Sequence, residues 1–287
     1  MAGPHPIPYP RRQASRWCLR QLAGGLIRHF GKLEVAGLEH LPKTGPVILA
    51  ANHFAFTDAP LLLYACPRLV EFIGGAERPN SPVWTRMIPQ SWGFIRAYRG
   101  GFSRSTLNAS LGVLEQDGVL GIFPEGGNWA NLLRPARPGL AFLALHSCAP
   151  VVPVSITGSD TLLAKPREKV GVQFHPPIPS PLISASGREK RRGLDAFSET
   201  VMAAVASGLP DAQRGRYAAD PAARCEEAAL PAAHACVDRR RREEEIGRHE
   251  EVQKDCRPAR DAAEHRHQRH PAGRRGAGAP HHLHGRH

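Results

Sequence analysis

The chain has 287 residues, of which 41% are hydrophobic, so it is long enough for one large domain or two modest ones with a real core. Its formal net charge of +12 indicates an anionic partner: a phosphate-bearing substrate, a membrane surface or a nucleic acid. The six cysteines show no close spacing such as C-x-x-C, which argues against a zinc knuckle or a disulfide scaffold and favours a reduced cytosolic setting. No apolar run approaches the roughly 18 residues that cross a bilayer. No signal peptide is recognisable either, so we expect a soluble or peripheral protein.

The N-terminal region divides into two parts. Residues 1–12 are rich in proline and end in two arginines, and we expect them to form a loose arm. Between residues 15 and 30, leucines recur at helical spacing beside arginines, which predicts a short basic amphipathic helix weakened by Gly24 and Gly25. Such a helix either packs on its own domain, which is the commoner case, or lies on an anionic membrane.

From residue 31 to residue 219, predicted strands and helices alternate. Short, apolar and partly β-branched segments predict strands at 32–37, 46–51, 69–74, 92–99, 119–123, 151–156 and 169–174. Helical periodicity predicts one helix that begins near residue 61 and further helices at 105–116, 139–146 and 194–207. This alternation predicts an α/β domain with a largely parallel mixed sheet flanked by helices, preceded by the arm and basic helix of residues 1–30.

The composition changes near residue 220. Residues 221–287 contain no Phe, Trp or Tyr, but they hold nine of the fifteen histidines. Such a segment buries too little apolar surface to offset the entropy of ordering it, so we expect 220–287 to be a low-complexity, disordered tail. Of the net charge of +12, nine charges belong to residues 1–220, so the folded part is basic in its own right.

His53 and Asp58 lie between the strand 46–51 and a helix whose first turn Pro60 favours. An imidazole that takes a proton from a hydroxyl needs a carboxylate to fix its tautomer and to stabilise the charge it gains. On one uninterrupted helix the two side chains would lie about 140° apart, but a turn between strand and helix can bring them together. Alternatively, Asp58 caps the helix and His53 is an ordinary strand-end histidine.

Asp58, Arg99 and Glu125 all lie at or just after the ends of predicted strands. In α/β sheets, functional residues collect in the loops beyond the carboxyl ends of the strands. The placement of these three residues makes them candidates for a functional site. Their plainer interpretations are a helix cap for Asp58, a surface arginine for Arg99, and a tight turn for Glu125 and the two glycines after it.

Four short blocks occur in order along the chain: Asn52-His53-x-x-x-x-Asp58, Gly93-Phe94-Ile95-x-x-x-Arg99, Phe123-Pro124-Glu125-Gly126 and Val152-Pro153-Val154. In order and spacing they resemble the glycerolipid acyltransferases, the PlsC-like 1-acylglycerol-3-phosphate acyltransferase family. The resemblance spans about residues 30 to 219 and implies the glycerol-3-phosphate acyltransferase-like fold. It also implies an O-acyltransferase that moves a fatty acyl group from acyl-CoA or acyl carrier protein to a lipid hydroxyl. The default acceptor is 1-acylglycerol-3-phosphate, in phospholipid biosynthesis.

The resemblance also implies roles for individual residues. His53 is the general base, Asp58 orients its imidazole, and no acyl-enzyme intermediate forms. The remaining assignments concern the acceptor: Arg99 holds its phosphate, and Glu125, Gly126, Gly127 and Asn128 shape its pocket. The fourth block is linked to the acyl donor. We expect no metal ion and no cofactor besides the acyl-CoA or acyl carrier protein co-substrate, and a peripheral location on the inner face of the cell membrane.

One departure concerns the third block. The family commonly has Thr-Arg after Glu-Gly, whereas this chain has Gly127 and Asn128, and an amide donates hydrogen bonds but carries no charge. Either another arginine supplies the cation, or the acceptor is not a phosphate monoester but, for example, a glycolipid or an amino-acid lipid. The candidate arginines are Arg99, Arg104, Arg134 and Arg137.

A non-catalytic basic membrane-binding protein is the alternative outside the enzymes. We expect no nucleic-acid partner, because the chain has no recognition module and few aromatic residues that could stack on bases.

Overall fold

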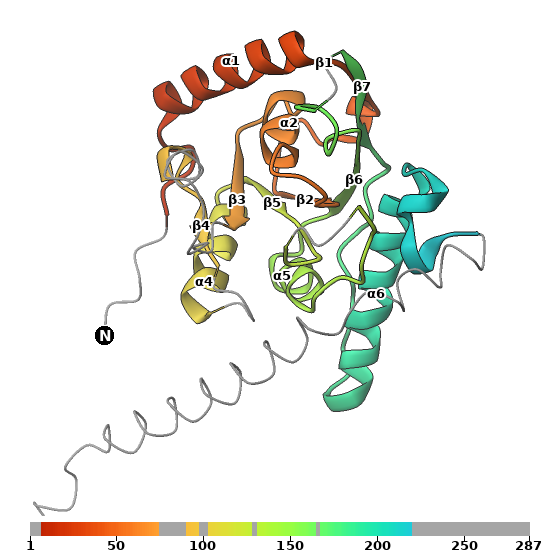
Figure 1. Cartoon of the computed structure of the whole chain (residues 1–287). Coiled ribbons are helices and arrows are strands. Elements are labelled where there is room, and N and C mark those ends of the chain that lie inside the picture. The colour runs from red at the N-terminus through yellow and green to blue at the C-terminus, as the bar shows by residue number, and fades with distance from the viewer. Residues whose placement is uncertain (1–6, 75–89, 98–102, 128–130, 165–166, 220–287) are drawn as a thin grey trace, which may run out of the picture. The chain divides into compact units, whose positions relative to one another are not determined.

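The computed structural model describes residues 7–74, 90–97, 103–127, 131–164 and 167–219 (Figure 1). The helices are α1 (Gln13–Phe30), α2 (Asp58–Ala65), α4 (Arg104–Leu114), α5 (Gly139–Ser147) and α6 (Gly187–Ser207), with short 3-10 turns at Leu38–His40, Asp211–Gln213 and Gly215–Tyr217. The strands are β1 (Gly31–Ala36), β2 (Val47–Ala51), β3 (Val70–Gly74), β4 (Ile95–Arg96), β5 (Val119–Ile122), β6 (Val151–Thr157) and β7 (Glu168–Phe174). The expected tail at 220–287 lies outside the described residues.

The seven strands form one sheet in the order β1-β7-β6-β2-β5-β3-β4. Every neighbouring pair is parallel except β6 and β7, which run antiparallel. The central strand β2 therefore has parallel neighbours on both sides, β6 and β5. The prediction of a largely parallel mixed sheet flanked by helices is confirmed.

Helices cover both faces of the sheet. Along β2, Val47 and Leu49 belong to the hydrophobic cluster that α2 contributes to, whereas Ile48 and Ala50 belong to the cluster that includes α4 and α5. All of β2 is inaccessible to solvent. This is why the strand reads in the sequence as an unbroken apolar run rather than an alternating one.

Helix α1 is continuous through Gly24 and packs with one face on α2. A β-carbon at Gly24 would lie 2.2 Å from the ring of Tyr64, so the glycine permits a close approach of the two helices. The interpretation that this helix packs on its own domain is therefore confirmed for that face. Outside that face, α1 exposes Trp17, Leu22 and Leu26. No helix in the described part of the chain is both long enough and apolar enough to span a bilayer.

Two expectations about local structure were wrong. Residues 7–12 are not a loose arm, because the Tyr9 hydroxyl donates to the carbonyl of Leu69 at 2.6 Å and the amide of Gln116 binds Tyr9 N and Ile7 O. Among residues 92–97 of the strand predicted at 92–99, only the two residues of β4 are extended in the sheet, because Trp92 ends a helical turn and buries its side chain; residues 98 and 99 lie outside the described residues. The apolar pattern there reflects burial of a turn rather than of a strand.

Candidate active site

The site forms where β2 and β5, which are neighbours in the sheet, reach their carboxyl ends. Asn52 directly follows β2 and is fully buried. Both polar atoms of its side-chain amide bind the neighbouring strand β6. Its Nδ2 donates to the carbonyl of Ile156 at 2.9 Å, and its Oδ1 accepts from the N–H of Ile156 at 2.8 Å. The end of β2 is thus fixed to β6 immediately before His53.

The strand-to-helix turn brings His53 and Asp58 together. Nδ1 of His53 lies 2.9 Å from Oδ2 of Asp58, and the same oxygen accepts the backbone N–H of Ala55 at 2.7 Å. Asp58 is the first residue of α2 and is fully buried, and its other oxygen, Oδ1, has no hydrogen-bond partner among the described residues. A buried carboxylate in this position makes Nδ1 the protonated nitrogen of a neutral imidazole and stabilises the positively charged ring.

The imidazole of His53 packs against the aromatic ring of the residue that directly follows β5. It stacks on Phe123 with ring centroids 4.2 Å apart and an interplanar angle of 17°. The His53 side chain retains 18% exposure, whereas that of its partner Asp58 has none. The imidazole can therefore meet a substrate while its carboxylate is shielded from water.

Glu125 follows β5 and is 3% exposed. Its Oε1 accepts the backbone N–H of His53 at 2.8 Å, and its Oε2 accepts the backbone N–H of Arg134 at 3.1 Å. Burial raises the pKa of Glu125 to about 8, against the lowering effect of these two hydrogen bonds. The carboxyl group of Glu125 thus joins the loop that carries His53 to the segment after residue 130.

The glycine after Glu125 is required by geometry. Gly126 has a φ of +76°, and a β-carbon there would lie 2.4 Å from Nε of Arg137. Arg137 donates from Nε to the carbonyl of Glu125 at 3.3 Å and from its backbone N–H to that of Pro124 at 2.8 Å. The guanidinium of Arg137 therefore lies over the turn. Gly127, with a φ of +156°, completes this turn.

The other predicted residues fall into two groups. Arg99 and Asn128 lie outside the described residues. Val152 and Val154 of the fourth block are fully buried in the core beside α2. In the pairing of β6 with β2, Val154 lies opposite Ala51, the residue before Asn52.

Sequence reasoning did not predict the contacts of two residues that hold the site together, Asn52 and Phe123. Both are part of the quoted blocks, but their partners are a backbone 104 residues away for Asn52 and the His53 ring for Phe123. A buried asparagine at the end of an all-apolar strand was the available signal, since such an amide needs hydrogen-bond partners.

Comparison with known proteins finds similar proteins among the acyltransferases. Residues 32–157 match the family model described as "Acyltransferase". The chain is 27% identical over 186 residues to a 1-acyl-sn-glycerol-3-phosphate acyltransferase of Limnanthes alba, and 26% identical to one of Limnanthes douglasii. In each case the match covers 60% of this chain but only 64% of the relative's length.

The fold has a counterpart among solved structures. The crystal structure of the 1-acyl-sn-glycerophosphate (LPA) acyltransferase PlsC from Thermotoga maritima matches with a TM-score of 0.50 and 22% identity, over 71% of this chain and 83% of that chain. The likeness concerns the fold. The family-model match over residues 32–157 and the curated relatives support an acyltransferase domain of the PlsC-like type in this chain.

Proposed function

We propose that the protein transfers a fatty acyl group from an acyl thioester to the hydroxyl group of a glycerolipid, with 1-acylglycerol-3-phosphate as the default acceptor. The observation that carries the proposal is the distance of 2.9 Å between His53 Nδ1 and Asp58 Oδ2. The curated relatives are named for this acceptor, which supports the choice of substrate.

The reaction follows from the state of the imidazole. Because Nδ1–H donates to Asp58, Nε2 carries the lone pair of the neutral ring and can accept a proton. His53 removes the proton of the acceptor hydroxyl while that oxygen attacks the thioester carbonyl, and Asp58 stabilises the imidazolium. The carbon–sulfur bond then breaks, and the proton passes from His53 to the leaving thiolate. The products are an ester and a free thiol, with no acyl-enzyme intermediate.

The donor in this proposal is acyl-CoA or acyl carrier protein, which enters as a co-substrate. Both carry the acyl group as a thioester on a phosphate-bearing carrier, and the net charge of +12 suits such anionic partners. A comparison of acyl-CoA with acyl carrier protein at equal concentration measures which of the two is preferred.

We place the protein at the inner face of the cell membrane as a peripheral protein. Support comes from α1, which has no acidic residue and exposes Trp17 (63%), Leu22 (61%) and Leu26 (51%). A helix of this kind binds anionic bilayers through apolar insertion and charge.

Leu22→Ala/Leu26→Ala should weaken salt-sensitive co-sedimentation with phosphatidylglycerol vesicles. The matched control Leu163→Ala/Leu182→Ala, which removes exposed leucines outside α1, should not. Equal binding by all three proteins would refute the assignment to α1.

The proposed reaction is tested by thioester cleavage. Wild type, His53→Ala and the surface control His146→Ala are given each donor with a panel of acceptors, and thiol release is measured. We expect acceptor-dependent release that disappears only in His53→Ala. No release from folded wild type with any pair of substrates contradicts the proposed function.

A second acceptor class is favoured by one feature of the sequence. Gly127 and Asn128 stand where the resembled family commonly has Thr-Arg, which removes a cation from the third block. An acceptor without a phosphate monoester, such as a glycolipid or an amino-acid lipid, fits that loss of charge. Including these lipids in the same panel distinguishes the two classes by their kcat/KM.

A further inference from the structure

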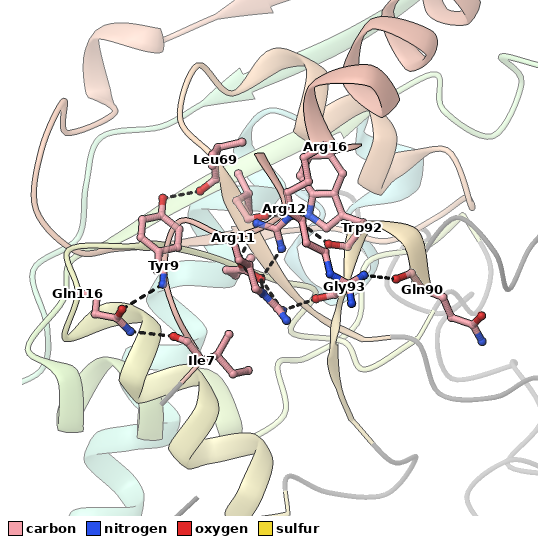
Figure 2. A network of polar contacts seen from close by, with 12 residues as sticks. Ile7, Tyr9, Arg11, Arg12, Arg16, Leu69, Gln90, Trp92, Gly93 and Gln116 are labelled. Atoms are coloured by element: carbon pink, nitrogen blue, oxygen red, sulfur yellow. Dashed lines mark hydrogen bonds and ion pairs between the residues drawn. The ribbon is translucent and has the colours of Figure 1, made fainter. Parts of the chain in front are cut away.

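Three arginines near the N-terminus bind four consecutive backbone carbonyls of one distant segment (Figure 2). The hydrogen bonds run from Arg12 Nη1 to Gln90 O (2.7 Å) and Ser91 O (3.3 Å), from Arg16 Nε to Trp92 O (3.0 Å), and from Arg11 Nη2 to Gly93 O. No other part of the described chain shows three guanidiniums converging on one run of carbonyls in this way. We call residues 90–93 the capped turn.

The capped turn needs these donors because it is the end of a helical segment. Residues 90–92 are helical, and the last carbonyls of a helix have no partner within it. Cations at this end also complement the partial negative charge of the helix. Gly93 has a φ of +84°, and a β-carbon there would lie 3.3 Å from the Arg12 guanidinium, so the glycine both ends the helix and leaves room for the arginine.

Two of the arginines are themselves fixed by a buried carboxylate on β3. Arg16 makes a two-pronged ion pair with Glu71, at 2.6 Å and 2.8 Å, and Arg11 binds Oε2 of the same residue at 2.8 Å. Arg16 and Glu71 are both fully buried. A buried ion pair is strongly destabilising to break because it leaves an uncompensated charge. The N-terminal segment is therefore firmly attached beside β3.

The residue after the capped turn begins a series of stacked rings that ends at the catalytic histidine. Phe94 stacks on Phe72 with centroids 5.5 Å apart, and Phe72 stacks on Phe123 at 5.5 Å. Phe123 in turn stacks on His53 at 4.2 Å. In a series of side chains packed in continuous contact, a displacement of the side chain at one end shifts the side chain at the other end.

We propose that Arg11, Arg12 and Arg16 are positioning residues for acyl transfer. By capping residues 90–93 they fix Phe94, and through Phe72 and Phe123 they fix the ring of His53. The inference rests on the proposed function, since it assigns the imidazole of His53 to the chemical step. The N-terminal segment 7–16 is then part of the catalytic domain.

Arg12 offers the sharpest test because it is exposed, so its loss leaves no buried charge behind. Full-length Arg12→Ala removes the two bonds to Gln90 and Ser91, and Arg12→Lys restores a cation and a donor at the same carbonyls. Arg68→Ala is the matched control. Its guanidinium also binds loop carbonyls, those of Pro42, Gly45 and Asp117, before the amino ends of β2 and β5.

Two quantities are measured for each protein: kcat with KM for donor and acceptor, and amide hydrogen exchange of the peptide that covers residues 90–97. Arg12→Ala should lower kcat about fivefold through misplacement of His53, leave the KM for the thioester unchanged, and speed exchange in that peptide. Arg12→Lys should recover most of the kcat. Arg68→Ala should lower the thermal midpoint comparably without either effect.

Equal kcat in Arg12→Ala and Arg68→Ala overturns the inference, and so does unchanged exchange at 90–97 in Arg12→Ala. Failure of the proposed function has a different signature, because then the wild type itself releases no thiol. In that case the exchange comparison alone decides whether Arg12 positions the capped turn.

Discussion

The carboxyl group of Glu125 accepts the backbone N–H of His53 at 2.8 Å, although the two residues are 72 positions apart in the chain. This contact fixes the main chain of His53, the proposed general base, whereas Asp58 fixes its ring. The glutamate of the third block thus has a structural role at the histidine itself, besides any part it takes in the proposed acceptor site.

Glu125→Gln should lower kcat by about 10- to 100-fold, because small displacements of a catalytic group are costly. Glutamine supplies one acceptor oxygen, so one of the two N–H groups that Glu125 accepts would face an amide nitrogen instead. Steady-state kinetics measures the loss. Glu115→Gln, at an exposed glutamate just after α4, serves as the control and should keep wild-type activity.

The stability of the wild type should fall as the pH rises toward 9. Burial raises the pKa of Glu125 from 4.5 to about 8, so the folded state holds a proton that the unfolded state releases. This contribution is complete below pH 4.5 and is lost as the pH rises through about 8. The slope is at most roughly 1.4 kcal/mol per pH unit. Urea unfolding of wild type and Glu125→Gln measures it, and parallel pH profiles of the two proteins would contradict it.

Asp58→Asn should reduce kcat by about 10³- to 10⁴-fold while binding of both substrates changes little. Asparagine has nearly the shape of aspartate but cannot stabilise the imidazolium or enforce one tautomer of His53. The comparison is Asp117→Asn, in a surface turn with a φ of +57°, where asparagine is well tolerated. A loss below about tenfold in Asp58→Asn would mean that His53 needs no carboxylate.

Asn52→Ala should destabilise the protein by about 2–4 kcal/mol, because it leaves the buried N–H and carbonyl of Ile156 without their amide partner. Chemical denaturation gives the difference in free energy of unfolding. Asn108→Ala, on the exposed side of α4, should stay within about 0.5 kcal/mol of wild type. Similar values for both variants would show that the link between β2 and β6 is dispensable.

Gly126→Ala and Gly45→Ala separate backbone strain from steric conflict. Both glycines have similar positive φ values, +76° and +79°, but only Gly126 has neighbouring atoms in the place of a β-carbon. Gly45→Ala should cost about 1–2 kcal/mol from its backbone alone. Gly126→Ala should cost about 1–3 kcal/mol more, and it should lower activity because Arg137 is displaced from the turn. Equal losses of stability would rule out a tight contact with Arg137.

The sequence alone predicted the mixed α/β sheet, because strands covered on both faces are apolar throughout and alternate with helical periodicity. It also paired His53 with Asp58, since a separation of five positions across the turn between strand and helix limits how far apart the two side chains can lie. The dyad is local in the chain, and local spacing constrains local geometry.

The tertiary structure alone decided what Glu125 and the N-terminal arginines bind. Their partners include backbone groups between 72 and 82 positions away, and the sequence does not indicate which main-chain N–H or carbonyl a side chain will bind. For the same reason residues 7–12 looked like a loose arm, although Arg11 and Arg12 cap a helical turn beside the site. The sequence specifies the chemistry of each side chain, but the backbone group that a side chain contacts is determined only when the chain folds.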